Sequence, residues 1–295
     1  TTSGDRMFTG AALRALRRLN MLVRGSVIDE ATALALTRAF ARNTDRLAAW
    51  QVQLISEAMT ASSGVADVDG PPNEAIAQRT ARLIVDLADE LEPMLVYAWR
   101  RHLADAVSRM LADVGSGSES DAPGQLRCVG FADLVSFTTL VRQLSERDLA
   151  RTVQRFEALA TDVVTAHGGR VVKTVGDEVL FSTRTPAPGA AIALDLVDAL
   201  AEDEVLPDLR VGVSFGTVVS RLGDVFGTTV NRAARLTALA HPNAVLVDGP
   251  LATALTSQSG FRLTAMRRRT LRGVGSVTPH VLARTSTPTR RGRYE

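Results

Sequence analysis

Residues 168 to 181 give the clearest indication of the fold of the second half of the chain and read Gly168-Gly-Arg-Val-Val-Lys-Thr-Val-Gly-Asp-Glu-Val-Leu-Phe181. Two short β-branched runs flank a Gly-Asp pair, which predicts antiparallel strands over 170–175 and 179–182 joined by a tight turn. Lys173 is the single lysine among 34 cationic side chains, the others all being arginine. Arginine supplies the positive charge everywhere else in the chain. A lone lysine four residues before an acidic turn therefore indicates a residue that recognises a substrate.

The residues around this hairpin continue the alternation of strands and helices. Strands are predicted over 126–131, 170–175, 179–182, 209–215, 218–222 and 244–247, and helices over 146–167, 188–202 and 229–240. The order β-α-β-β-α-β predicts a ferredoxin-like α/β sandwich of the α+β class, with extra elements at its end.

The first half of the chain is predicted to be helical throughout. Leucines recur at helical spacing over 10–25, and Asp29 is suited to cap a long helix that ends near residue 59. A loop is expected over 62–72, and Asn73 is expected to cap a further helix that Pro93 bends or restarts. No catalytic constellation is found here, so this half is interpreted as a regulatory or dimerising module.

Composition shifts divide the chain into four parts. We predict a helical domain over 1–114, a flexible Gly- and Ser-rich linker over 115–125, a catalytic domain over 126–286 and a basic tail over 287–295.

Bulk properties exclude several classes of protein. The net charge of +2 is too small to indicate a nucleic-acid partner, and no aromatic residues are interleaved with the arginine clusters. A single cysteine, Cys128, excludes an internal disulfide framework and fits a reducing compartment. No uninterrupted apolar stretch is long enough to span a bilayer, so we expect a soluble cytoplasmic protein without a membrane span.

Two aspartates are candidates for metal binding. Asp133 follows the first predicted strand, and Asp177 occupies the hairpin turn. In a split β-α-β-β topology the first strand and the hairpin are adjacent, so the two carboxylates can converge on one edge of the sheet. Paired hard oxygen ligands suit Mg²⁺ bound through a triphosphate. The backbone N–H groups after Asp133, including those of Phe137 and Thr138, are candidates to bind phosphate oxygens.

A second constellation lies near residue 230. The predicted helix that starts at residue 229 places Asn231 and Arg235, four residues apart, on one face. An amide beside a guanidinium is suited to stabilise charge that develops on a phosphoryl group. Arg232 points elsewhere by the same spacing.

Three motifs make a resemblance specific: Gly130-Phe-Ala-Asp-Leu-Val-Ser-Phe-Thr138, Lys173-Thr-Val-Gly-Asp-Glu-Val-Leu-Phe181 and Asp224-Val-Phe-Gly-Thr-Thr-Val-Asn-Arg-Ala-Ala-Arg235. With them, residues 126 to about 285 resemble the catalytic domain of class III nucleotidyl cyclases. The resemblance implies an adenylate cyclase that converts ATP to 3′,5′-cyclic AMP and pyrophosphate. The helical half is similar in layout to the regulatory domains of soluble bacterial adenylyl cyclases, some of which respond to pH.

The resemblance also assigns roles to individual residues. Asp133 and Asp177 would hold two Mg²⁺ or Mn²⁺ ions, Lys173 and Asp224 would recognise the base, and Asn231 and Arg235 would stabilise the transition state. The family's triphosphate-binding lysine is absent, and Arg272 is its candidate substitute. The resemblance further implies a homodimer in which the metal aspartates of one chain meet the base-reading and transition-state residues of the other.

The base preference also follows from hydrogen-bond chemistry. A lysine can only donate and an ionised aspartate can only accept, which matches N1 and the exocyclic amine of adenine. Guanine presents the opposite pattern on the same edge, so adenine is the expected base.

Two rival functions remain open. One is a catalytically degenerate domain that binds nucleotide and signals through the helical half. The other is a guanylate or diguanylate cyclase, because Val175-Gly-Asp-Glu-Val179 resembles the Gly-Gly-Asp-Glu-Phe turn of diguanylate cyclases. The regulator of the helical half is also open: a small molecule or a proton would serve, and His102 titrates in the physiological range.

Overall fold

The structure is a computed structural model that describes residues 10–62, 74–115, 124–221 and 223–285. The chain divides into two compact units, Thr1–Ser118 and Glu119–Glu295. Most of the predicted linker over 115–125, the predicted loop with Asn73 and the basic tail over 287–295 lie outside the described residues.

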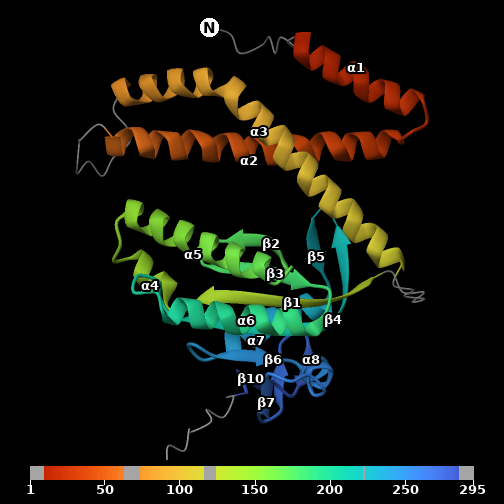
Figure 1. Cartoon of the computed structure of the whole chain (residues 1–295), viewed down its shortest axis with the longest axis vertical. Coiled ribbons are helices and arrows are strands. Elements are labelled where there is room, and N and C mark those ends of the chain that lie inside the picture. Colours follow the sequence, from red (N-terminus) through yellow and green to blue (C-terminus); the bar gives the residue numbers. More distant parts are fainter. Residues whose placement is uncertain (1–9, 63–73, 116–123, 222, 286–295) are drawn as a thin grey trace, which may run out of the picture. The chain divides into compact units, whose positions relative to one another are not determined.

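The first unit consists of helices α1 (Gly10–Arg24), α2 (Glu30–Ser62) and α3 (Glu74–Gly115) (Figure 1). Asp29 caps α2 as predicted, because its Oδ1 accepts a hydrogen bond of 2.7 Å from the N–H of Thr32. Pro93 lies inside α3, which continues past it and changes direction part-way along. A proline bends a helix because it lacks an N–H donor and its ring clashes with the carbonyl four residues earlier.

None of the helices within the described ranges combines the length and the apolar character that crossing a bilayer would require.

The second unit has the predicted β-α-β-β-α-β core: β1 (Gln125–Leu134), α5 (Glu146–Ala166), β2 (Arg170–Val175), β3 (Glu178–Thr183), α6 (Pro186–Ala201) and β4 (Leu209–Arg221). The strand order is β2-β3-β1-β4, and every neighbouring pair among these four is antiparallel. This arrangement is the ferredoxin-like sandwich that the sequence predicts.

Further elements extend this core. β6 (Val245–Val247), β10 (His280–Arg284) and β7 (Phe261–Ala265) continue the sheet beyond β4, and β5 (Asp224–Phe226) pairs with the end of β4. β8 (Arg269–Leu271) and β9 (Gly275–Val277) form a separate two-stranded sheet. The remaining helices are α4 (Phe137–Val141), α7 (Thr228–Leu239) and α8 (Gly249–Leu255).

The prediction of two strands over 209–215 and 218–222 is wrong. β4 is one continuous strand from Leu209 to Arg221, and residue 222 lies outside the described part of the chain. Gly216 suggests a break, but it has no positive φ. It lies instead beneath α7, where an added Cβ would come within 2.8 Å of the Thr229 hydroxyl.

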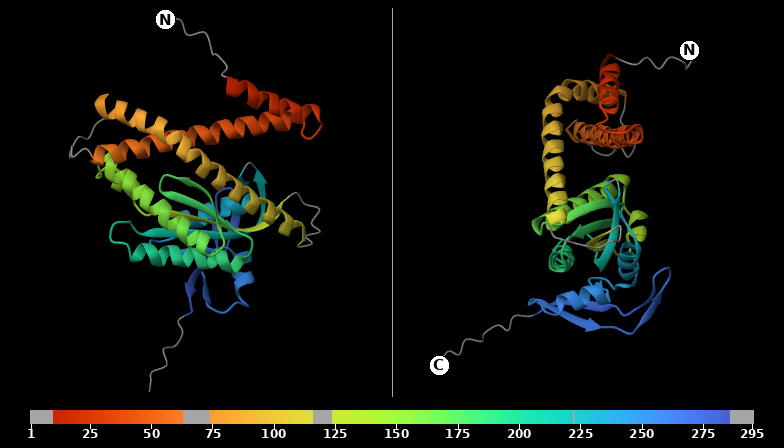
Figure 2. Two further views of the ribbon diagram at one scale, coloured as in Figure 1. Left: turned by 45° about the horizontal axis from the view of Figure 1, so that its top comes forward. Right: turned by 90° about the vertical axis from the view of Figure 1, so that its right-hand side faces the viewer.

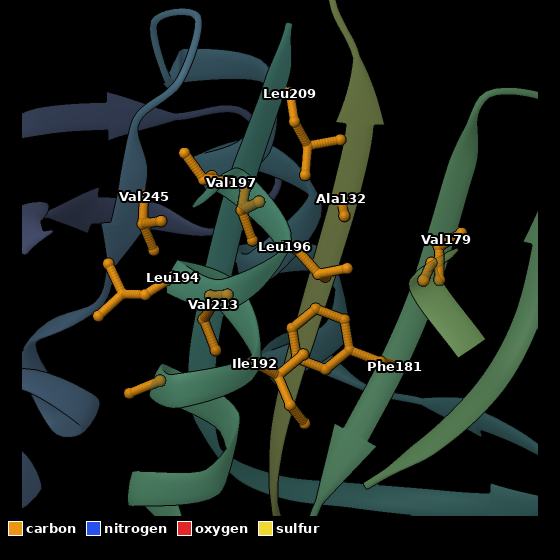
Figure 3. Close-up of a cluster of buried hydrophobic side chains, with 14 of the residues drawn as sticks. Ala132, Val179, Phe181, Ile192, Leu194, Leu196, Val197, Leu209, Val213 and Val245 are labelled. Carbon is orange, nitrogen blue, oxygen red and sulfur yellow. The ribbon is translucent and has the colours of Figure 1, made fainter. Parts of the chain in front are cut away.

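One face of the sheet carries the main hydrophobic core. Phe181 of β3, Val213 of β4 and Ile192 of α6 are fully buried there (Figure 3). Cys128 is also buried on this face, as a core residue. Helices α5 and α6 cover this face, and α7 covers the opposite one (Figure 2).

Helix α7 lies unusually close to β4 because a glycine faces it. A Cβ added at Gly212 would come within 2.2 Å of the Thr237 nitrogen and 2.6 Å of the Ala233 oxygen. The absence of a side chain at this position therefore sets the distance between α7 and the sheet.

Candidate active site

Most of the predicted functional side chains lie on the face of the sheet that α7 covers, or on α7 itself. Asp133 is opposite Glu178 of β3 and opposite Arg210 of β4, so the strand register brings these three side chains together on one face. Arg210 contacts Asp133 Oδ2 with Nη2 at 2.5 Å and Nε at 2.7 Å. Asp177 lies in the turn between β2 and β3. Its backbone oxygen accepts a hydrogen bond of 3.1 Å from the N–H of Leu134. The two predicted aspartates are therefore neighbours at one edge of the sheet.

The carboxylates in this cluster repel one another. Burial raises the pKa of Asp177 above its ordinary value, and the charge of Asp133 raises it further despite nearby Arg210. Burial also raises the pKa of Glu178, together with the charges of Asp133 and Asp177. Three acidic groups on one small patch of surface hold excess negative charge, which a bound cation would relieve.

This donor set fits divalent cations that are shared with a substrate. Asp133 and Asp177 supply hard carboxylate oxygens, which Mg²⁺ and Mn²⁺ prefer. Within the described ranges, no group of three or more His, Cys, Asp or Glu side chains is arranged as a complete metal cage. Ions held by two carboxylates would need further oxygens from water and from phosphate groups, and this is the usual arrangement for magnesium bound with nucleotides.

Lys173 and Asp224 meet on the same face. Lys173 Nζ donates a hydrogen bond of 2.7 Å to Asp224 Oδ2. Partial burial alone would raise the pKa of Asp224, but the hydrogen bonds from Lys173 and from the Val225 N–H and the charges of Lys173 and Arg170 outweigh it and lower the pKa. Asp224 is therefore held ionised, as a hydrogen-bond acceptor.

Asn231 and Arg235 are exposed on α7, one helical turn apart, as the sequence predicts. Arg232 between them points into the protein, where its Nη1 lies 2.8 Å from Oδ2 of the fully buried Asp248. Asp248 also accepts hydrogen bonds from the Ser214 hydroxyl and from the N–H of Leu251. This network fixes the rotation of α7 and so the direction in which Asn231 and Arg235 project.

The other predicted substrate-binding residues are Phe137, Thr138 and Arg272. Phe137 is buried at the start of the short helix α4, and Thr138 is exposed beside it. Arg272 is exposed in the β8–β9 turn, and within the described ranges no hydrogen bond or ion pair joins it to the carboxylate cluster.

Two residues of the carboxylate cluster were not among the predicted site residues. Arg210 is the strongest example, because it contacts Asp133 directly but lies in an apolar strand segment. Its position as the one charged residue in Leu209-Arg-Val-Gly-Val-Ser-Phe215 is the signal that could have identified it. Glu178 is the second, and its position opposite Asp133 depends on strand register.

Comparisons with known proteins identify the family and several relatives of this chain. Residues 123–284 match the family described as the adenylate and guanylate cyclase catalytic domain. An adenylate cyclase of Glutamicibacter nicotianae is 41% identical over 287 residues, which cover 94% of this chain and 70% of that protein. An adenylate cyclase of Streptomyces coelicolor is 39% identical over 304 residues, which cover 94% of this chain and 77% of that protein.

A solved structure shows the same fold. The catalytic core of a rhodopsin-guanylyl cyclase with converted specificity, in complex with ATPαS, has a TM-score of 0.51 and 20% identity. The match covers 55% of this chain and 97% of that one. Together, the family match, the relatives and the fold show that the chain belongs to the adenylate and guanylate cyclase catalytic domain family.

Proposed function

We propose that this protein is an adenylate cyclase that converts ATP to 3′,5′-cyclic AMP and pyrophosphate. The observation that carries the proposal is the Lys173–Asp224 pair, which lies on the same face of the sheet as Asp133, on the strand that leads into the turn with Asp177. The adenylate cyclases of Glutamicibacter nicotianae and Streptomyces coelicolor, which match 94% of the chain, support the same activity.

The Lys173–Asp224 pair selects adenine by hydrogen bonding. The lysine donates to N1, and the ionised aspartate accepts from the exocyclic amine. Guanine would place a donor against the lysine and an acceptor against the aspartate, leaving polar groups unpaired, and such mismatches are rejected strongly. A guanylate cyclase is therefore disfavoured by the same two residues.

Asp133 and Asp177 are proposed to hold two divalent cations, Mg²⁺ or Mn²⁺, as is general in this family. When bound, the ions would lower the pKa of the ribose 3′-hydroxyl and neutralise the phosphate oxygens. Arg210 already contacts Asp133. Its guanidinium has further N–H donors suited to phosphate oxygens, so it is a stronger candidate than Arg272 to bind the triphosphate.

Bond changes at the α-phosphorus complete the reaction. The ribose 3′-oxygen forms a bond to the α-phosphorus, the bond to the pyrophosphate oxygen breaks, and the hydroxyl proton passes to water. Asn231 is proposed to orient the ribose, and Arg235 to offset negative charge at the α-phosphate. Both side chains are exposed on α7 and available to a nucleotide.

The active sites are proposed to lie between two copies of the chain. One copy would supply Asp133 and Asp177, and the other would supply Lys173, Asp224, Asn231 and Arg235. A two-fold dimer produces two such sites from one self-complementary interface. The exposure of Asn231 and Arg235, without side-chain partners among the described residues, is compatible with a site completed by a second chain.

The helical unit is proposed to regulate or to dimerise the enzyme. Large apolar side chains are exposed on all three helices, including Met21 of α1, Phe40 of α2 and Tyr97 of α3. Its described core is small, with Ala33 and Thr80 as the buried residues. Apolar surface of this extent is typical of a module that is covered by a partner.

The proposal is tested by incubating the full chain with ATP, or with GTP, in the presence of Mn²⁺ or Mg²⁺. Cyclic AMP formed from ATP, and lost in Asp133→Ala and Asp177→Ala, is the expected result. Nucleotide binding without any product would indicate a degenerate domain, and a dinucleotide formed from GTP would indicate a diguanylate cyclase.

A further inference from the structure

Arg170 lies on β2 three residues before Lys173, a spacing that normally places two side chains on opposite faces of a strand. The pairing of β2 with β3 shifts register between Val171 and Lys173, so that Arg170 is opposite Ser182 and Lys173 is opposite Leu180. Ser182 and Leu180 are two residues apart and share a face. The bulge therefore brings Arg170 to the same face as Lys173.

Arg170 reaches the backbone of the turn that carries Asp224. Its Nη2 donates a hydrogen bond to the carbonyl oxygen of Gly223, the residue just before Asp224. Gly223 has φ +85°, a conformation that favours glycine, in the connection between β4 and β5. Lys173 holds the side chain of Asp224 at 2.7 Å. Two cations of β2 thus hold both the backbone and the carboxylate of this turn.

The arrangement also has an electrostatic consequence. When Lys173 donates its hydrogen bond to a purine, Asp224 loses part of the stabilisation that Lys173 provides. Arg170 remains hydrogen-bonded to the adjacent Gly223 carbonyl. Arg170 is among the charges that keep the pKa of Asp224 low, after the larger effects of burial, Lys173 and the Val225 N–H. Asp224 can then remain an ionised acceptor when substrate is bound.

We propose that Arg170 is a positioning residue for purine discrimination, which fixes Asp224 through the Gly223 carbonyl so that the site accepts adenine and rejects guanine. This inference rests on the proposed function, because it assigns the same Lys173–Asp224 pair to the base.

The test compares kcat/KM for ATP and for GTP in the full chain and in Arg170→Met, Arg170→Lys and Lys173→Ala. We expect Arg170→Met to lower the ATP:GTP ratio roughly tenfold, mainly through a higher KM for ATP with little change in kcat. Arg170→Lys keeps the charge and should recover part of the ratio. Arg262→Met on β7 is the matched control, since Arg262 is an exposed strand arginine outside this site.

A ratio in Arg170→Met within about twofold of wild type, or an equal loss in Arg262→Met, would overturn the proposal. If Arg170→Met does not unfold cooperatively, the neutral variant Arg170→Gln takes its place under the same threshold. If the ATP:GTP ratio changes in Lys173→Ala but not in the Arg170 variants, the proposed function stands and Arg170 has no part in purine discrimination. If the wild type forms no cyclic nucleotide, the proposed function fails, and the ATP:GTP ratio of equilibrium dissociation constants tests Arg170 instead.

Discussion

At the scale of single residues, the site brings together several carboxyl groups of the same charge, which the fold itself does not require. Asp177 and Glu178 both have pKa values raised by burial and by neighbouring carboxylates. A carboxyl group whose pKa is raised in the folded state binds protons more tightly there than in the unfolded chain. Its stability contribution is therefore greatest at low pH and is lost as pH rises through the folded-state pKa. These acidic groups are retained at a cost in stability near neutral pH.

We predict that Asp177→Asn abolishes cyclase activity but raises the melting temperature at pH 7 to 8 by about 1–2 °C. The gain should shrink as pH falls and the wild-type carboxyl group becomes protonated. Thermal unfolding of both proteins between pH 4 and pH 8 measures it. A variant that is less stable than wild type at neutral pH would show that Asp177 is structurally required.

Lys173 and Asp224 are predicted to set base preference without supporting the fold. Lys173→Ala and Asp224→Ala should each lower the ATP:GTP ratio of kcat/KM by about tenfold or more, because each removes one half of the donor–acceptor match. Melting temperatures should stay close to that of wild type, since both side chains lie at the surface of the sheet. An unchanged ratio would remove both residues from base recognition.

At the scale of elements, the distance between α7 and β4 depends on Gly212. A methyl group at this position would overlap backbone atoms of α7, which cannot move aside as a flexible side chain can. We predict that Gly212→Ala lowers the free energy of unfolding by about 2–3 kcal/mol. Urea denaturation measures this change.

Gly249→Ala provides the control for that experiment. A Cβ at Gly249 would meet no atom within 4 Å, and its φ is not positive. Stability should therefore stay the same or rise slightly. Equal losses in both variants would mean that the close approach of α7 is not the cause.

At the scale of the whole molecule, shared active sites predict recovery of activity between two inactive chains. Asp133→Ala and Arg235→Ala damage different halves of a site, so a mixed dimer would have one doubly damaged site and one intact site. If the chains assort randomly, half of the dimers are mixed and about a quarter of wild-type activity should return. Confirmed mixed dimers without activity would show that each chain builds its own site.

The helical unit is predicted to change the activity of the catalytic unit as pH varies. The comparison is between the full chain and residues 119–295, the second compact unit, from pH 5.5 to 8. Cooperative thermal unfolding of the shorter chain is the control for folding. Identical activity profiles would contradict a regulatory role.

The sequence alone predicted the β-α-β-β-α-β order, which the structure confirms, and six candidate site residues, because both rest on local signals. Alternating β-branched runs define the strands, and side chains such as Lys173 and Asp133 stand out in short motifs. It also assigned the α2 cap to Asp29 correctly, since a cap acts within one helical turn.

The features that depend on pairing between distant segments became visible only in the folded chain. Strand register placed Arg210, 77 residues away in sequence, against Asp133. A single extra residue in β2 brought Arg170 to the face of Lys173, which no count of alternating positions predicts. Gly216 likewise does not break β4 but faces Thr229 of the helix packed above it, a contact that the sequence does not reveal. Such contacts arise only when the sheet forms, because they involve atoms that the sequence separates widely.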